Sequence, residues 1–316
     1  MKKTLDIVTS AYNEEIAIPI LYNRICETMS QEANYEWRMI ICDNVSTDST
    51  WKCISEIAKK DSRIVGVKLS RNFAFDSAIT CGLDLCEADA VVVMCSDLQH
   101  PPELLNSFLR HYENGYEQVV AKITEREGLS NLRQPLVKLF YFLAEKASNG
   151  IVRNNVSDFR LMSKKVYKTV NTLRESKRFM RGLMSWPGFK TKEIEMVRPP
   201  RMGGESKFAA RKLIGVIAES FESILAFSTI PLRIISLIGI ISSIFSVCLL
   251  FSFVILAFTK GVPFAGFGTI VSLLLLAMSL ILMVLGVLGS YIGLIYEETK
   301  GRPTYVIDEI IMIKEM

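Results

Sequence analysis

The 316-residue chain is 50% hydrophobic with a mean hydropathy of +0.28, which is too apolar for an ordinary soluble enzyme. Its formal net charge is +4, and many basic residues lie between Arg174 and Lys212, just before a strongly apolar region. This pattern favours anionic headgroups or phosphate ligands and speaks against a nucleic-acid partner. The seven cysteines form no C-x-x-C pair, which indicates neither a disulfide framework nor a zinc site and favours reduced thiols in the cytosol.

The first part of the chain alternates short apolar runs with stretches of helical spacing. Strands are predicted at residues 5–9, 38–42, 64–69, 90–95 and 118–123. Helices are predicted at residues 16–29 and 49–60, then up to about residue 86, and from 103 to about 114. Strands that alternate with helices predict an α/β fold with a doubly wound, mostly parallel sheet.

Residues 91–103 are the stretch around which the chain is organised. A β-branched apolar run reads as a buried parallel strand, and it ends in Asp97, Gln99 and a Pro-Pro pair before Glu103 opens a helix. Open α/β sheets bind ligands at the carboxyl ends of their strands. A carboxylate and an amide oxygen there could bind Mg²⁺ or Mn²⁺, which would hold phosphates. Taken alone, the stretch fits a capping Asp equally well.

The other motifs narrow the kind of site. No G-x-G-x-x-G or G-x-x-x-x-G-K-[ST] follows the first strand, so the dinucleotide-binding and P-loop interpretations lose support. The two histidines, His100 and His111, offer no metal-binding spacing. Polar strand ends instead gather carboxylates and amides that suit a nucleotide base, a ribose and a metal-bound diphosphate.

The second part of the chain carries further basic segments. An amphipathic helix is predicted at residues 131–149 and a late strand at 192–197. Between them, residues 156–162 place Asp158 and Arg160 in one short segment. The loop at 198–207 combines glycines, a hydroxyl and bases, so it either wraps a phosphate or is a flexible linker.

The last part of the chain is strongly apolar. Residues 208–229 are amphipathic and fit either a membrane-interface helix or a surface helix. Residues 234–258 and 267–295 each exceed the roughly 20 residues that cross a bilayer, and neither contains a charged residue. Two transmembrane helices are therefore predicted, with the main domain and both termini in the cytoplasm because the flanking segments are basic.

This pattern gives a four-part domain plan. The predicted parts are a catalytic domain at 1–204, juxtamembrane helices at 205–232, a transmembrane hairpin at 233–296 and a cytoplasmic tail at 297–316.

Six motifs in order carry a family resemblance. They are Tyr12-Asn13-Glu14, residues 43–48, Arg71-Asn72, residues 97–103, residues 157–161 and residues 204–208. Together they resemble the inverting GT-A glycosyltransferases of family 2. The closer similarity is to polyprenyl-phosphate glycosyltransferases, which include dolichyl-phosphate mannose synthases and the bacterial bactoprenol glucosyltransferases of O-antigen modification.

The resemblance implies the reaction and its partners. A sugar, with glucose from UDP-glucose as the best guess, would pass from a nucleotide sugar to undecaprenyl phosphate on the cytoplasmic face of the bacterial inner membrane. The product would be a lipid-linked sugar for cell-surface polysaccharide modification. Mg²⁺ or Mn²⁺ would be the cofactor, the GT-A catalytic domain would precede two transmembrane helices, and the protein would form a homo-oligomer.

The resemblance also assigns residues. The nucleotide sugar would contact Tyr12, Asn13, Glu14, Asp43 and Arg71. Asp97 and Gln99 would bind the metal. Asp158, as the candidate base, and Asp97 would be the catalytic residues. Diphosphate or acceptor phosphate would contact Arg126, Arg133, Arg201, Ser206 and Lys207. Because the acceptor phosphate is already mostly dianionic at neutral pH, we expect Asp158 to position groups more than to remove a proton.

Three departures from the family pattern bear on this interpretation. Cys95 replaces the first acid of the usual Asp-x-Asp. Val45 replaces a glycine and cannot easily take φ > 0, so its loop is expected to run differently. Residues 74–76 replace a glycine and a base, which could alter the choice of sugar.

Two other functions compete with an active polyprenyl-phosphate transferase. A catalytically retired membrane scaffold for a flippase or a partner transferase is the alternative that Cys95 favours. A processive polysaccharide synthase lacks support, because such enzymes carry more spans and a Gln-x-x-Arg-Trp segment that is absent from this sequence.

Overall fold

The computed structural model describes residues 2–126, 156–176, 178–199 and 266–313, with isolated positions between 237 and 259. The chain divides into two compact units. One comprises Met1–Ser220 and Arg302–Met316, and the other comprises Phe221–Gly301. The helix predicted at 131–149, the amphipathic segment at 208–229 and most of the first predicted span lie outside the described residues.

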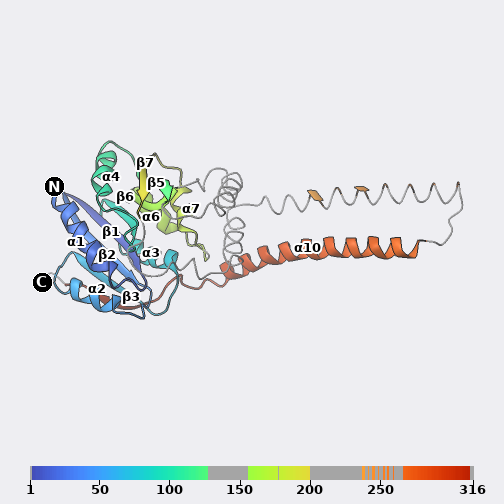
Figure 1. Cartoon of the computed structure of the whole chain (residues 1–316), viewed down its shortest axis with the longest axis horizontal. Coiled ribbons are helices and arrows are strands. Elements are labelled where there is room, and N and C mark those ends of the chain that lie inside the picture. The colour runs from blue at the N-terminus through green and yellow to red at the C-terminus, as the bar shows by residue number, and fades with distance from the viewer. Residues whose placement is uncertain are drawn as a thin grey trace. The chain divides into compact units, whose positions relative to one another are not determined.

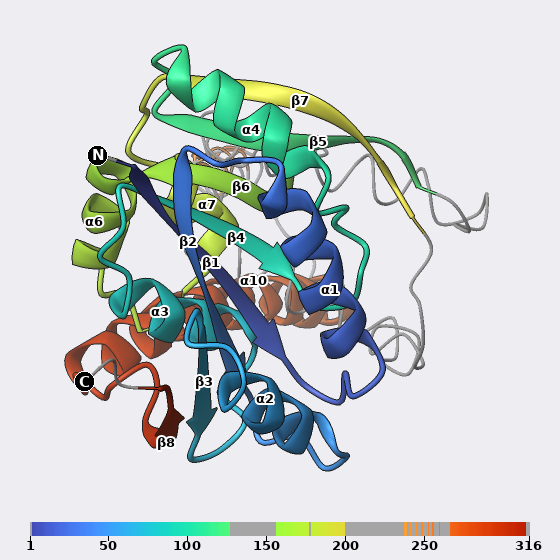
Figure 2. The same cartoon turned by 90° about the vertical axis from the view of Figure 1, so that its left-hand side faces the viewer.

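The first unit contains an eight-stranded sheet in the order β7-β5-β6-β4-β1-β2-β3-β8 (Figures 1 and 2). The strands are β1 (Lys3–Ala11), β2 (Tyr35–Asp43), β3 (Ile64–Leu69), β4 (Ala90–Cys95), β5 (Gln118–Arg126), β6 (Val156–Ser163), β7 (Thr191–Arg198) and β8 (Ile307–Ile311). Strand β6 runs antiparallel to its neighbours β4 and β5, and β8 runs antiparallel to β3. The remaining neighbours pair in parallel, which confirms the predicted mostly parallel sheet.

Helices cover both faces of this sheet, as the continuous apolar strands require. Those of the first unit are α1 (Ala17–Ser30), α2 (Thr50–Ala58), α3 (Phe75–Asp84), α4 (Leu104–Glu113), α6 (Lys164–Thr172) and α7 (Met180–Ser185). Helices α1, α2 and α4 share one core with residues such as Leu5 and Ile7 of β1. On the other face α3 packs very closely, since a Cβ on Gly82 would lie 2.3 Å from Cγ1 of Val8. The layers fix the strand ends on which the site depends.

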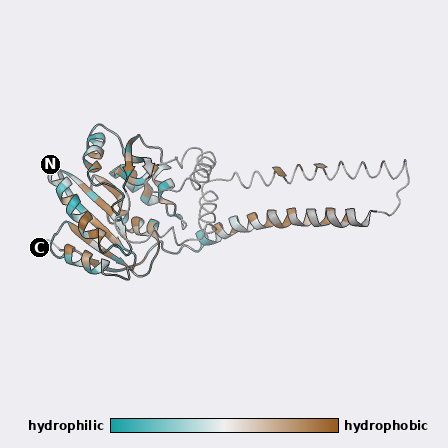
Figure 3. Ribbon diagram, viewed as in Figure 1, coloured by the Kyte–Doolittle hydropathy of each residue, from teal (hydrophilic) through white to brown (hydrophobic). Residues whose placement is uncertain are grey.

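The second unit contributes the 33-residue helix α10 (Phe267–Thr299), which begins where the second span is predicted. Among the described residues it is the one helix long and apolar enough to cross a membrane, over Leu280–Thr299 with a mean hydropathy of 1.9 (Figure 3). A helix of this length measures about 50 Å, more than the roughly 30 Å of a bilayer core. The described residues therefore contain one candidate span where the sequence predicts two.

The loop after β2 corrects an expectation from the sequence. Val45 adopts φ 60° in spite of its branched Cβ, so the prediction that this residue would avoid positive φ is wrong. The left-handed region is strongly disfavoured for β-branched residues. It persists here because the loop turns back on itself, with the backbone N–H of Ser46 donating to Oδ2 of Asp43 at 3.1 Å.

Replacement of Val45 by Gly should therefore stabilise the protein. The left-handed backbone costs a non-glycine residue about 1–2 kcal/mol, which exceeds the 0.5–1 kcal/mol entropic cost of glycine. We expect a melting temperature a few degrees higher by circular dichroism. Val197→Gly is the matched control, because that side chain is 53% exposed within strand β7. A drop in melting temperature for Val45→Gly as large as that of the control would contradict the strain argument.

Candidate functional site

The loops after β1 and β2 are joined by hydrogen bonds at the carboxyl edge of the sheet. The backbone N–H of Asn13 donates to Oγ of Ser46 at 3.0 Å, and Oδ1 of Asn13 accepts from the N–H of Thr47 at 2.8 Å. Asp43 ends β2, is fully buried and accepts from both the N–H and the hydroxyl of Ser46. Burial raises the pKa of Asp43, and its hydrogen bonds with Ser46 oppose that shift. Two predicted nucleotide contacts, Asn13 and Asp43, thus lie in one network.

The remaining predicted nucleotide contacts lie on the same edge. Tyr12 follows β1 directly and is half-buried, and Glu14 is buried with its backbone N–H donating to Oγ1 of Thr50 at 2.8 Å. Arg71 follows β3, is exposed, and stacks its guanidinium 4.3 Å from the centre of the Phe73 ring.

Asn44 connects these loops to α3, and sequence reasoning gave it no role of its own. Its Nδ2 donates to Oγ of Ser10 and to the carbonyl of Ala74, both at 3.2 Å. Its Oδ1 accepts from the N–H of Phe73 at 3.3 Å. Ala74 itself has φ 70°, in the left-handed region that favours glycine. One buried amide therefore joins the ends of β1 and β2 to the segment that enters α3.

The end of β4 carries the predicted metal ligands. Oδ1 of Asp97 accepts from the backbone N–H of Gln99 at 3.1 Å. The side chain of Gln99 lies between two groups from the end of β7: its Oε1 accepts from Nη2 of Arg198, and its Nε2 donates to the carbonyl of Pro199 at 3.4 Å. The guanidinium of Arg198 therefore donates a hydrogen bond to the amide oxygen of Gln99, which the sequence analysis predicts as a metal ligand.

His100 links this strand end to the start of β6. Its Nδ1 accepts from the backbone N–H of Cys95 at 2.9 Å, and its Nε2 lies 2.9 Å from Oγ of Ser157. The ring stacks on Phe159 with centroids 5.0 Å apart. Burial lowers the pKa of His100 to about 4, so the ring is neutral at neutral pH. Because Nδ1 accepts a backbone hydrogen bond, the proton lies on Nε2 and is donated to Ser157.

Asp158 forms a bidentate ion pair with Arg181 of α7. The Nε–Oδ1 and Nη2–Oδ2 distances are 3.0 and 2.6 Å, and the side chains are 19% and 25% exposed. Burial alone would raise the pKa of Asp158, but the charge and hydrogen bonds of Arg181 lower it to about 2. Asp158 is therefore a weak base that holds a guanidinium in a fixed orientation.

Arg160 lies behind this pair with its side chain fully buried. Its Nη2 donates to the carbonyl of Ser157 at 3.1 Å and its Nη1 to Oγ of Ser185 at 3.3 Å. Burial lowers the pKa of Arg160 to about 10, which still leaves it charged at neutral pH. Its positive charge adds to that of Arg181 and favours the ionised form of Asp158.

Asp76, in the first turn of α3, faces the same cluster. Burial and then the charge of Asp158 raise its pKa to about 7, opposed by a hydrogen bond from the backbone of Met180. Asp76 therefore adds to this cluster a carboxyl group that is partly protonated at neutral pH.

The side chains at the end of β4 include groups that can bind a divalent cation. Mg²⁺ commonly binds through one or two carboxylates together with substrate phosphates, and Asp97 supplies one such carboxylate. The amide oxygen of Gln99 already accepts one hydrogen bond from Arg198 and has a second lone pair for a cation. No group of three or more His, Cys, Asp or Glu side chains forms a metal cluster in the described part of the chain. The residues thus fit a cation shared with a diphosphate.

The predicted phosphate contacts have side chains outside the described part of the structure. Arg133, Arg201, Ser206 and Lys207 lie outside the described residues, and Arg126 is described only as the last backbone position of β5. Sequence reasoning assigned no role to Arg181, Arg198, His100, Ser157 and Asn44. The first two lie in segments noted as basic, but no local signal indicates their partners.

Comparison with known proteins identifies the family. The family model described as Glycosyl transferase family 2 matches residues 6–170, which include the ends of β1, β2, β3 and β4 and also Asp158. The chain belongs to glycosyl transferase family 2. It is therefore a glycosyltransferase.

Relatives of this glycosyltransferase match it over nearly its whole length. A bactoprenol glucosyl transferase of Shigella phage SfX is 35% identical over 303 residues, covering 96% of this chain and 98% of the relative. A prophage bactoprenol glucosyl transferase homolog of Escherichia coli (strain K12) is 33% identical, covering 97% and 99%. The glycosyltransferase YkcC of Bacillus subtilis (strain 168) is 35% identical, covering 96% and 93%.

Solved structures are more distant from this glycosyltransferase. Glucosyl-3-phosphoglycerate synthase from Mycobacterium tuberculosis, in complex with Mn²⁺, uridine diphosphate and phosphoglyceric acid, has 18% sequence identity and a TM-score of 0.49. The match covers 71% of this chain and 78% of that protein.

Proposed function

We propose that this glycosyltransferase transfers glucose, with inversion, from UDP-glucose to undecaprenyl phosphate at the cytoplasmic face of the bacterial inner membrane. The observation that carries the proposal is the 35% identity to a protein named bactoprenol glucosyl transferase over 96% of this chain. A match of that extent includes both the sheet with its polar edge and the apolar helix α10. The product would be a lipid-linked sugar for modification of cell-surface polysaccharides.

The donor would bind where the ends of β1, β2 and β3 meet. The proposed contacts with the nucleotide sugar are Tyr12, Asn13, Glu14, Asp43 and Arg71. Support comes from the hydrogen-bond network that joins Asn13 to the Asp43 loop through Ser46 and Thr47. Such a preformed edge holds a ligand at little further entropic cost.

The diphosphate of the donor would lie near the end of β4. Asp97 and Gln99 would hold a divalent cation, Mg²⁺ or Mn²⁺. When bound, the cation would supply positive charge for the leaving nucleoside diphosphate. The side chains Arg181 and Arg198 add permanent positive charge to this region. Charge that is already in place stabilises a developing anion without reorganisation.

The acceptor needs orientation more than deprotonation. A phosphate monoester has a second pKa near 6 and is mostly dianionic at neutral pH. With a pKa of about 2, Asp158 would contribute by holding Arg181 toward that phosphate. The other proposed phosphate contacts are Arg126, Arg133, Arg201, Ser206 and Lys207. The apolar α10 would keep the enzyme at the membrane, where the lipid acceptor lies.

The test is a transfer assay with purified full-length protein in detergent. Radiolabelled UDP- and GDP-sugars would be offered with undecaprenyl phosphate in Mg²⁺, in Mn²⁺ and in chelator. We expect one labelled lipid product, from UDP-glucose, and none with Asp97→Ala. A product from another donor would correct the sugar. No product from any donor, with the protein folded, would replace the proposal by the membrane-scaffold alternative.

A further inference from the structure

The guanidinium of Arg198 is half-buried and only partly satisfied by the described residues. One nitrogen, Nη2, donates to Oε1 of Gln99. Another, Nε, is buried and has no hydrogen-bond partner in the described part of the structure. Buried N–H donors are rarely left without an acceptor, so each exception needs an explanation. A ligand oxygen at this position would provide one.

Cys95 adds no carboxylate to the end of β4. The carboxylate of Asp158 is already paired with Arg181, and Arg198 contacts Gln99, two residues after Asp97. An aspartate at position 95, as the family resemblance implies, would add a negative charge to this strand end and favour a cation.

We propose that Arg198 binds the diphosphate of the donor directly. Its positive charge would replace part of the charge that a divalent cation supplies in a site with more carboxylates. The proposal rests on the proposed function, in that the donor is a nucleoside diphosphate sugar. Arginine suits the role because its planar fork matches phosphate oxygens and its charge is permanent. In this arrangement Gln99 orients Arg198 by accepting its Nη2 hydrogen bond.

Binding of UDP tests the arginine separately from catalysis. Isothermal titration calorimetry on full-length protein in detergent would measure Kd in chelator and in Mn²⁺. Wild type should bind UDP in chelator, and Arg198→Gln should weaken that binding about ten- to hundredfold, with a smaller loss in Mn²⁺. Arg198→Lys should be intermediate, because it keeps the charge without the fork.

Lys192→Gln is the matched control, since it removes one positive charge from an earlier position of the same strand β7. Circular dichroism would confirm that each variant is folded. An unchanged Kd for Arg198→Gln in chelator, or no binding by wild type in chelator, would overturn the proposal. Bound UDP without any sugar transfer would count against the proposed function alone.

Manganese binding without nucleotide tests how Cys95 affects the strand end. Electron paramagnetic resonance of free Mn²⁺ should show weak binding to wild type and about tenfold tighter binding to Cys95→Asp, because one added carboxylate changes the local charge. Cys95→Asn is the matched control, similar in size to Asp but uncharged. Equal Mn²⁺ affinity for the Asp and Asn variants would contradict the inference that the missing carboxylate at position 95 weakens cation binding.

Discussion

Replacement of Asp158 by Asn should lower kcat/KM for sugar transfer about 10²–10³-fold, and replacement of Arg181 by Gln should do the same. The two side chains form one bidentate pair, with distances of 3.0 and 2.6 Å. Residues that act as a unit are strongly non-additive, so the double variant should lose little more than either single variant. Initial rates with labelled UDP-glucose and undecaprenyl phosphate measure all three effects.

A matched control for this pair is available in the same basic segment. Arg174 forms a comparable bidentate pair with Asp84, at 2.7 and 2.9 Å, but lies on the surface away from the strand ends. Arg174→Gln should leave kcat/KM close to that of wild type. If the losses from Asp158→Asn and Arg181→Gln instead multiplied in the double variant, the two residues would act independently.

The pH profile separates orientation from proton removal. The rate should rise as pH increases through about 6, because the dianionic fraction of the acceptor phosphate rises. Asp158, with a pKa of about 2, is already ionised throughout that range. Asp158→Asn should therefore keep the midpoint while lowering the rate. Asp76→Asn should also keep the midpoint of the pH profile. This control is necessary because the pKa of Asp76 is about 7, so Asp76 also titrates near that midpoint. Loss of the midpoint in Asp158→Asn alone would identify Asp158 as a base.

The parallel strands and their polar ends could be predicted because both signals are local. A β-branched run such as residues 91–93 is buried on both faces, and the polar residues that follow the strand must leave the sheet. Strands β6 and β8 were not predicted. Both run antiparallel beside strands that are distant in sequence, and β8 joins β3 from the far end of the chain. Pairing of that kind leaves little trace in a single segment.

The partners of the site residues could not be predicted for the same reason. Arg181 lies 23 residues from Asp158, and Arg198 lies 99 residues from Gln99. A basic residue in the sequence indicates charge but not the carboxylate or amide that it contacts. The prediction that Val45 would avoid positive φ was wrong for a different reason. Hydrogen bonds between Ser46 and Asp43 hold the backbone of Val45 in a conformation that the valine side chain disfavours.

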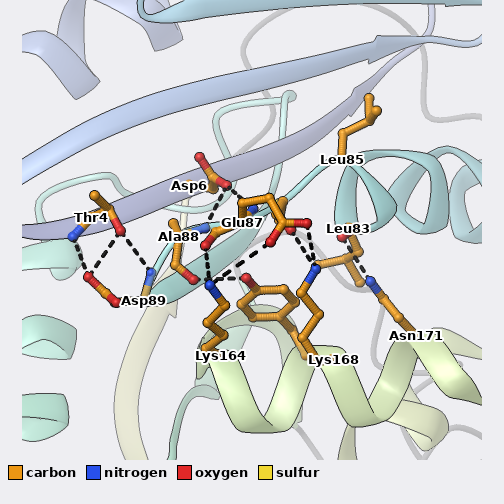
Figure 4. Close-up of polar contacts among 12 residues, drawn as sticks. Thr4, Asp6, Leu83, Leu85, Glu87, Ala88, Asp89, Lys164, Lys168 and Asn171 are labelled. Atoms are coloured by element: carbon orange, nitrogen blue, oxygen red, sulfur yellow. Dashed lines mark hydrogen bonds and ion pairs between the residues drawn. The ribbon is translucent and has the colours of Figure 1, made fainter.

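The opposite edge of the sheet holds a second cluster, which stabilises the fold and takes no part in the proposed chemistry. Asp6 of β1 is 3% exposed and accepts from Nε and Nη2 of Arg38, both at 2.9 Å. It also accepts from the backbone N–H groups of Glu87 at 3.1 Å and Ala88 at 3.4 Å. Figure 4 shows Asp6 beside these two residues and the lysines of α6. One carboxylate therefore satisfies several donors from separate elements.

Asp6→Ala should destabilise the protein by about 3 kcal/mol, because it leaves the partly buried guanidinium of Arg38 with only the carbonyl of Leu85 and removes the acceptor of two backbone donors. For a unit of this size that corresponds to a melting temperature about 6–12 °C lower, measured by circular dichroism on the full chain. Glu87→Ala is the matched control. The Glu87 side chain is 74% exposed and its ion pair with Lys168 lies on the surface, so its loss should change the melting temperature little. Equal shifts for the two variants would mean that burial of the Asp6 carboxylate does not matter. A large shift for Asp6→Ala alone would establish that the sheet depends on this edge, independently of the chemistry at the other.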